Sequence, residues 1–124
     1  MFKKLETDRA PAAIGPYSQG VFAGGFLFLS GSIPLIAESG EVVAGSVAEQ
    51  TEQVMQNISA LLSAAGLSFD NVVKTTCFLT DMADFQAFNG VYAKYFITKP
   101  ARSTVAAAGL PRGVKVEVEV IAYA

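Results

Sequence analysis

Residues 46–66 read SVAEQTEQVMQNISALLSAAG, and this stretch sets much of the fold. Ser46 and Glu49 form the S-x-x-E pattern of a capping box, in which each side chain accepts a hydrogen bond from a backbone amide at a helix start. Apolar residues then recur at helical spacing, and Gly66 suits the left-handed conformation that ends many helices. The pattern predicts an amphipathic helix over residues 47–65.

The segments that follow predict a strand, a second helix and two more strands. Residues 72–79 are apolar and β-branched, which is typical of a buried strand. Thr80 or Asp81 can cap a second helix, and residues 102–108 and 114–122 are further strands joined by a turn. The apolar stripe of the second helix consists of Phe85, Phe88, Tyr92 and Phe96.

Upstream of the first helix, residues 20–23 and 26–30 flank Gly24-Gly25 and predict a tight hairpin. The predicted order along the chain is β-β-β-α-β-α-β-β. This order indicates an α+β fold, one domain over residues 1–124, in which two helices cover one face of a mixed sheet.

The last strand alternates between an apolar and a polar face. If Gly109 pairs with Val114 across the preceding turn, Arg102 lies on the same face as Glu117 and Glu119. A slip of one residue would separate them. The apolar face carries Val114, Val116, Val118, Val120 and Ala122, whereas Lys115 and Ile121 join the two glutamates on the other.

The composition favours association with identical subunits and disfavours nucleic acid. Hydrophobic residues make up 52% of the chain and charged residues 16%, against about 25% charged in an ordinary domain. The surplus apolar surface predicts a homo-oligomer. A net charge of −2, without a basic stripe, disfavours a nucleic-acid partner.

Several classes of enzyme are excluded by residues that the chain lacks. It contains no histidine, which rules out a Ser-His-Asp triad, a Cys-His pair and histidine-based zinc sites. Phosphate-loop and dinucleotide motifs are also missing, so we expect no metal or organic cofactor. The longest apolar run, residues 21–29, is far shorter than the about 20 residues that span a bilayer. We expect a cytoplasmic protein without a signal peptide or membrane span.

Arg102 is the candidate with the clearest chemistry. It opens a strand of otherwise small and apolar residues, so a buried guanidinium there needs an acidic partner or an anionic ligand. Sequence alone leaves both possibilities open. Glu117 and Glu119 taken alone favour an outward polar row on an amphipathic strand.

Four other residues have simpler interpretations. Cys77 is interpreted as core filler, because nothing nearby in the sequence would lower its pKa. Arg112 lies beside a glycine in the predicted turn and is interpreted as a solvated charge. Asn89 is expected to cap or bridge backbone groups, and Tyr17 can either pack or face a ligand.

Five motifs together resemble the signatures of the RidA/YjgF family over residues 10–122. The resemblance implies a chorismate-mutase-like fold assembled as a homotrimer, with ligand clefts between subunits. The motifs are AAIGPYSQ at residues 12–19, LSG at 29–31, PARS at 100–103, LP at 110–111 and VEVE at 116–119.

The resemblance also implies an activity: hydrolysis of 2-imino acids, the enamine and imine products of pyridoxal-phosphate dehydratases, to 2-keto acids and ammonia. Its substrates would include 2-iminobutanoate and 2-iminopropanoate. By position, Arg102 resembles the carboxylate-binding arginine of the family and Glu117 its water-orienting glutamate. Tyr17 resembles a tyrosine that lines the cleft, and Ser30 and Gly31 correspond to residues at the edge of the cleft.

The chain departs from the family pattern at two positions that bear on substrate preference. Many members have Cys where this chain has Thr104, a substrate-binding position, and Gln where it has Ser32. Two alternative functions remain from the sequence: a metabolite-binding regulatory trimer without turnover, and the ribonuclease or translation-inhibitor activity ascribed to some relatives. Chorismate mutase activity would rest on fold analogy alone.

Overall fold

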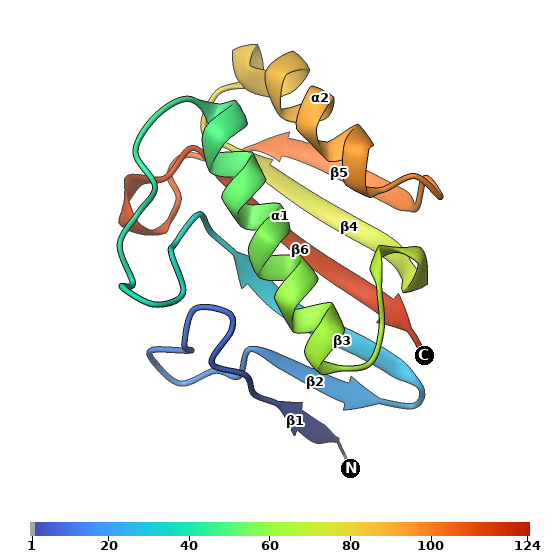
Figure 1. Ribbon diagram of the computed structural model, residues 1–124. Coiled ribbons are helices and arrows are strands. Elements are labelled where there is room, and N and C mark those ends of the chain that lie inside the picture. The colour runs from blue at the N-terminus through green and yellow to red at the C-terminus, as the bar shows by residue number, and fades with distance from the viewer. Residues whose placement is uncertain (1) are drawn as a thin grey trace.

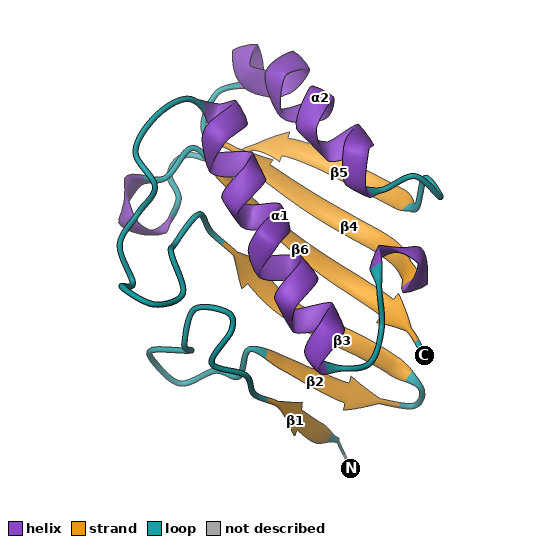
Figure 2. Cartoon of the chain, in the orientation of Figure 1, coloured by secondary structure: helices purple, strands orange, loops and turns teal. Residues whose placement is uncertain are grey.

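The computed structural model describes residues 2–124, in which six strands form one mixed sheet and both long helices lie on the same face of it (Figures 1 and 2). The strands follow the order β1-β2-β3-β6-β4-β5. Only β4 and β5 are parallel neighbours. The predicted α+β architecture is confirmed. The elements are β1 (Lys3–Leu5), β2 (Gly20–Ala23), β3 (Phe26–Ser32), α1 (Val47–Ala64), β4 (Val72–Leu79), α2 (Phe85–Tyr95), β5 (Ala101–Ala106) and β6 (Val116–Tyr123).

The capping box that predicted α1 and the glycine pair that predicted the β2–β3 hairpin are both formed in the structure. Ser46 accepts from the Glu49 amide, and the Glu49 side chain accepts from the Ser46 amide, so the capping box is formed. Gly66 has φ +74° just beyond the end of the helix. Gly24 and Gly25 have φ +58° and +84°, the left-handed pair that a two-residue hairpin turn requires.

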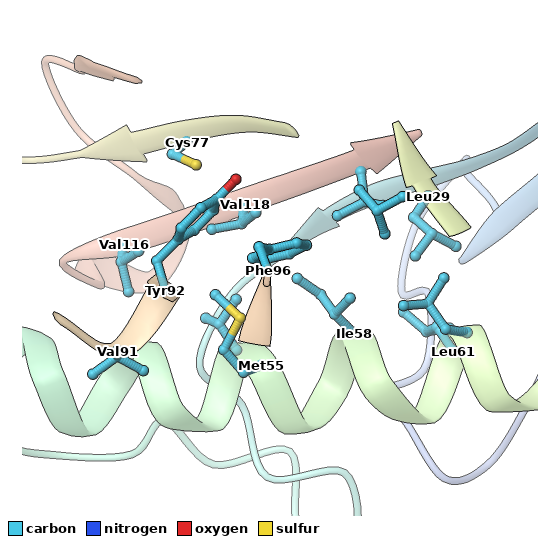
Figure 3. Packing of buried hydrophobic residues seen from close by; sticks show 14 of the residues in the cluster. Leu29, Met55, Ile58, Leu61, Cys77, Val91, Tyr92, Phe96, Val116 and Val118 are labelled. Carbon is cyan, nitrogen blue, oxygen red and sulfur yellow. The ribbon is translucent and has the colours of Figure 1, made fainter. Parts of the chain in front are cut away.

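The hydrophobic core lies between the two helices and the sheet (Figure 3). Met55, Ile58 and Leu61 point from α1 toward the strands, where Val116 and Val118 of β6 and Leu29 of β3 belong to the same cluster (Figure 3). All the even-numbered residues of β6 are buried, which confirms the predicted apolar face of this strand. Cys77 is fully buried in the core, as predicted, and burial raises the pKa of its thiol.

The predicted pairing of the last two strands is wrong, because β4 lies between them. The Ala107 amide donates to Leu79 O (2.7 Å) and the Thr80 amide to Lys115 O (3.3 Å), so the end of β4 holds both flanking segments. The turn at Pro111–Gly113 has the composition of a hairpin turn but belongs to a longer connection that crosses over one strand. A strand followed by a crossover helix pairs in parallel with the next strand, and α2 makes β4 and β5 such a pair.

This strand order places the Arg102 side chain on the opposite face of the sheet from the one predicted. Arg102 is opposite Thr75, which is opposite Val120 of β6, so the three residues share the helix-covered face. Glu117 and Glu119 alternate with the buried residues of β6 and therefore lie on the other face. The proposed juxtaposition of Arg102 with the two glutamates does not exist within one chain.

The face of the sheet away from the helices carries exposed aromatic side chains as well as Glu117 and Glu119; we call it the open face. Phe26, Phe28 and Tyr123 form an aromatic cluster on it, with ring centroids 4.9 and 6.2 Å apart. Each of these side chains remains at least 38% exposed. Neither α1 nor α2 is both long and apolar enough to cross a membrane, and the same holds for every helix within residues 2–124.

Candidate active site

Five of the six predicted site residues line two separate hollows. A cavity of about 570 Å³, the glutamate hollow, is lined by Tyr17, Ser30, Gly31 and Glu117 among others. A second cavity of about 490 Å³, the arginine hollow, contains Arg102. Its other lining residues are Asn89, Tyr92, Ala93, Phe96, Ile97, Lys99 and Pro100.

An irregularity in β3 shapes the glutamate hollow. The pairing of β3 with β6 shifts register between Leu29 and Ser32, so Ser30 and Gly31 bulge from the ladder. A Cβ atom on Gly31 would collide with Oε2 of Glu117. A residue without a side chain at this position therefore lets the carboxylate lie directly against the backbone of β3.

The loop that carries Tyr17 is fixed to β2 and β3 by polar contacts. The buried Gln19 side chain donates to Pro11 O (2.8 Å) and Thr7 O (3.0 Å), and it accepts from the Thr7 amide (2.8 Å). Ser30 Oγ donates to the carbonyl of the residue preceding Gln19, Ser18 (2.5 Å). These bonds hold the loop while Tyr17 itself stays 55% exposed at the rim of the hollow.

Glu117 has the electrostatic character of a general acid or base. Its carboxylate is half-buried and makes no hydrogen bond to any side chain or amide of residues 2–124. Burial raises the pKa of Glu117, and the neighbouring charge of Glu119 raises it further. A carboxyl group whose pKa is raised in this way can exchange protons closer to neutral pH than an ordinary glutamate can.

Arg102 is held by α2 and has no acidic partner among residues 2–124. Its Nη1 donates to Oδ1 of Asn89 at 2.6 Å. Its guanidinium carbon lies 4.6 Å from the ring centroid of Tyr92 and 5.4 Å from that of Phe85. Within residues 2–124 the recorded salt bridge is Lys94 to Glu52, which leaves the charge of Arg102 unpaired.

Two sequence-based interpretations are therefore corrected. The acidic partner that the sequence left open as an alternative to a ligand is not Glu117 or Glu119, since those side chains and Arg102 lie on opposite faces of the sheet. Asn89 contacts the guanidinium rather than backbone groups. The sequence contained the relevant signal, because Phe85, Asn89 and Tyr92 follow i, i+4, i+7 spacing and so share one face of a helix.

Thr104 lines neither hollow. It lies on the same face as Arg102, opposite Cys77 of β4, and its buried Oγ1 has no hydrogen-bond partner among the described residues. Within residues 2–124, no three acidic or cysteine side chains are grouped so that they could hold a metal ion. The charged groups available for chemistry are therefore Lys99 and the unpaired guanidinium of Arg102 in one hollow, and the carboxyl groups of Glu117 and Glu119 in the other.

Comparison with known proteins places the chain in a large group of relatives. The model of the family described as Endoribonuclease L-PSP matches residues 7–124. A RutC family protein of Pyrococcus horikoshii is 51% identical over 99% of this chain and 98% of its own. The 2-iminobutanoate/2-iminopropanoate deaminase of Mus musculus is 47% identical over 97% of this chain and 90% of its own.

The fold is shared as closely as the sequence. The crystal structure of Escherichia coli TdcF with bound serine superposes with a TM-score of 0.93. The two chains are 44% identical, and the match covers 98% of each.

Proposed function

The chain belongs to the Endoribonuclease L-PSP family, to which the resemblance to RidA/YjgF proteins also pointed, and from this premise we propose that it hydrolyses 2-imino acids to 2-keto acids and ammonia. The substrates proposed are 2-iminobutanoate and 2-iminopropanoate. The observation that carries the proposal is the unpaired guanidinium of Arg102, which suits a carboxylate ligand. Relatives at this level of identity include a protein named as that deaminase.

In the proposed site, Arg102 and Glu117 come from different subunits. The two residues lie on opposite faces of one sheet, so a single chain cannot present both to one small substrate. The hollows are also opposite in charge: the arginine hollow is lined by Lys99 and Arg102, the glutamate hollow by Glu117 and Glu119. Docking one hollow onto the other is a head-to-tail contact, which closes into a ring when the rotation permits.

We propose that this ring is a homotrimer, and its assembly would also cover the open face. The aromatic cluster of Phe26, Phe28 and Tyr123 is the apolar surface that such contacts would bury. Sedimentation equilibrium at micromolar protein concentration tests the assembly. A mass of one or two chains would refute the trimer.

Arg102 would bind the carboxylate that all 2-imino acids carry. A guanidinium presents parallel N–H donors that match both carboxylate oxygens, and the charge strengthens each hydrogen bond. Since Nη1 already donates to Asn89, the remaining N–H groups are free to face the ligand. The carboxylate would thereby hold the adjacent imine carbon in a fixed position.

Glu117 would handle the protons of the reaction. Water attacks the imine carbon, forming a C–O bond while the π electrons of the C=N bond move to nitrogen. Glu117 takes a proton from the attacking water and returns it to the nitrogen, which gives a tetrahedral carbinolamine with a hydroxyl and an amino group. A second transfer through Glu117, from the carbinolamine hydroxyl to the amino nitrogen, breaks the C–N bond and releases ammonia while the C=O bond of the keto acid forms. The raised pKa of Glu117 fits this dual role, because proton transfer is most effective near the working pH. Water and side chains suffice for these steps.

The family description also names ribonuclease activity, which this chain supports poorly. Its net charge is −2, and both glutamates line the larger hollow, where an RNA phosphate would be repelled. RNA binding measured between 50 mM and 200 mM salt tests this alternative. A steep loss of affinity with salt, together with cleavage, would favour it.

A coupled assay tests the proposed reaction. A pyridoxal-phosphate dehydratase generates 2-iminobutanoate or 2-iminopropanoate, and semicarbazide traps the imine that remains. We expect the protein to shorten the lifetime of the imine and to reduce the trapped product. An unchanged lifetime, with 2-oxobutanoate bound normally, would assign the protein to metabolite binding without turnover.

A further inference from the structure

Three residues on one face of α2 contact the same side chain, that of Arg102. Phe85, Asn89 and Tyr92 recur at i, i+4 and i+7, and all three contact the guanidinium of Arg102. The guanidinium carbon lies 4.6 Å from the ring centroid of Tyr92 and 5.4 Å from that of Phe85. Oδ1 of Asn89 accepts a hydrogen bond from Nη1 at 2.6 Å. Arg102 is therefore fixed in position before any ligand arrives.

The aromatic part of this helix face is itself fixed. Tyr92 extends from α2 toward β4, beside Cys77 (Figure 3), and its hydroxyl makes a buried 2.8 Å hydrogen bond with Thr75 Oγ1. Its ring stacks on Phe96 with centroids 4.4 Å apart. A ring held at both its edge and its face is a rigid surface for the guanidinium, so the direction of the guanidinium is set by α2.

Asn89, the remaining residue of this helix face, is uncharged. A partly buried arginine is ordinarily paired with a carboxylate, and aspartate has nearly the size and shape of asparagine. A carboxylate in place of the Asn89 amide would therefore bond the same Nη1, but it would also cancel the charge. The amide of Asn89 supplies the geometry of a partner without its negative charge.

We propose that Asn89 is a positioning residue that orients Arg102 while leaving its positive charge for the carboxylate of the ligand. This inference rests on the proposed function, in which that carboxylate belongs to a 2-imino or 2-keto acid. The inference itself requires only that residue 89 provides an uncharged hydrogen-bond acceptor for Arg102. Ligand affinity and the stability of the fold should consequently respond in opposite directions when the acceptor becomes charged.

Asn89→Asp tests the requirement for neutrality. Binding of 2-oxobutanoate is measured by calorimetry, the thermal midpoint by circular dichroism, and kcat and KM by the coupled imine assay. We expect at least a tenfold weaker Kd and a raised KM, with an unchanged or higher midpoint because the introduced carboxylate forms an ion pair with Arg102. A structural role alone would leave Kd and KM unchanged.

Two further variants complete the experiment. Asn89→Ala removes the acceptor without adding charge, and it should weaken binding several-fold through lost orientation. Gln86→Glu adds the same charge to an exposed position of α2 and should bind as the wild type does. Loss of binding in Gln86→Glu equal to that in Asn89→Asp would overturn the proposal, because the effect would then be one of net charge.

The outcomes separate the inference from the proposed function. Wild-type Kd and KM in Asn89→Asp would overturn the inference and leave the deaminase proposal intact. Normal binding of 2-oxobutanoate by the wild type without imine hydrolysis, but with weakened binding in Asn89→Asp, would overturn the deaminase and support the inference. Wild-type protein that binds no 2-keto acid would overturn both.

Discussion

Replacing Arg102 by lysine keeps the positive charge in the arginine hollow and removes the planar guanidinium group. The lysine ammonium is a point charge on a flexible stem, so it cannot offer parallel donors to a carboxylate. It also cannot stack as a plane against Tyr92 and Phe85, which lie 4.6 and 5.4 Å from the guanidinium carbon. Charge is preserved while orientation is lost.

The expected loss of activity follows from one charge-assisted hydrogen bond. Such a bond contributes about 1.5–3 kcal/mol, which corresponds to about a ten- to hundredfold decrease in kcat/KM. The effect on stability should be much smaller, because Arg102 forms no salt bridge within the described chain. The contacts with the two rings account for about 0.5–1 kcal/mol each at a partly exposed site, and lysine retains a share of them.

The measurement is the coupled imine assay combined with a thermal melt and sedimentation of the same sample. Arg112→Lys is the matched control, since Arg112 is exposed and donates to Gly40 O at 3.4 Å; we expect wild-type kcat/KM for it. Wild-type kcat/KM in Arg102→Lys with a lowered melting point would refute the anchoring role and indicate a purely structural arginine.

Three other perturbations follow from the glutamate hollow and the proposed chemistry. Glu117→Gln should lower kcat far more than it weakens 2-oxobutanoate binding, and unchanged kcat would move the role to Glu119 or to backbone groups. Because the raised pKa of Glu117 means that its ionised form is disfavoured in the fold, wild-type stability should fall as pH rises from the ordinary carboxyl range through the raised pKa. Chemical denaturation should therefore find Glu117→Gln more stable than the wild type at pH 7 and equal to it below about pH 4. Gly31→Ala should displace the Glu117 carboxylate and lower kcat while the thermal midpoint changes little, and wild-type kcat would show that this close approach is dispensable. Exhaustive dialysis against EDTA should leave imine hydrolysis unchanged, whereas a loss that added divalent metal restores would contradict a reaction carried by water and side chains.

The helices and the buried faces could be predicted from the sequence because their causes are local. The capping box at Ser46, the pair Gly24-Gly25 and the alternation along β6 each act through neighbours within a few residues. Fixed periods of 3.6 and 2 residues then determine which side chains face the core. For the same reason, Phe85, Asn89 and Tyr92 could be placed on one helix face before their common partner was known.

The sequence determined that the chain carries a carboxylate-binding candidate, Arg102, and a proton-transfer candidate, Glu117, on strands of an α+β fold. Which strand lies beside which depends on contacts between segments distant along the chain, and a turn composition such as Pro111–Gly113 does not specify whether a strand is inserted between its flanks. Only the tertiary structure put β4 between β5 and β6, and with it Arg102 and Glu117 on opposite faces of the sheet. Because side chains alternate between the faces of a strand, that single choice of neighbour separates the two residues within one chain, and the proposed chemistry therefore needs a second copy.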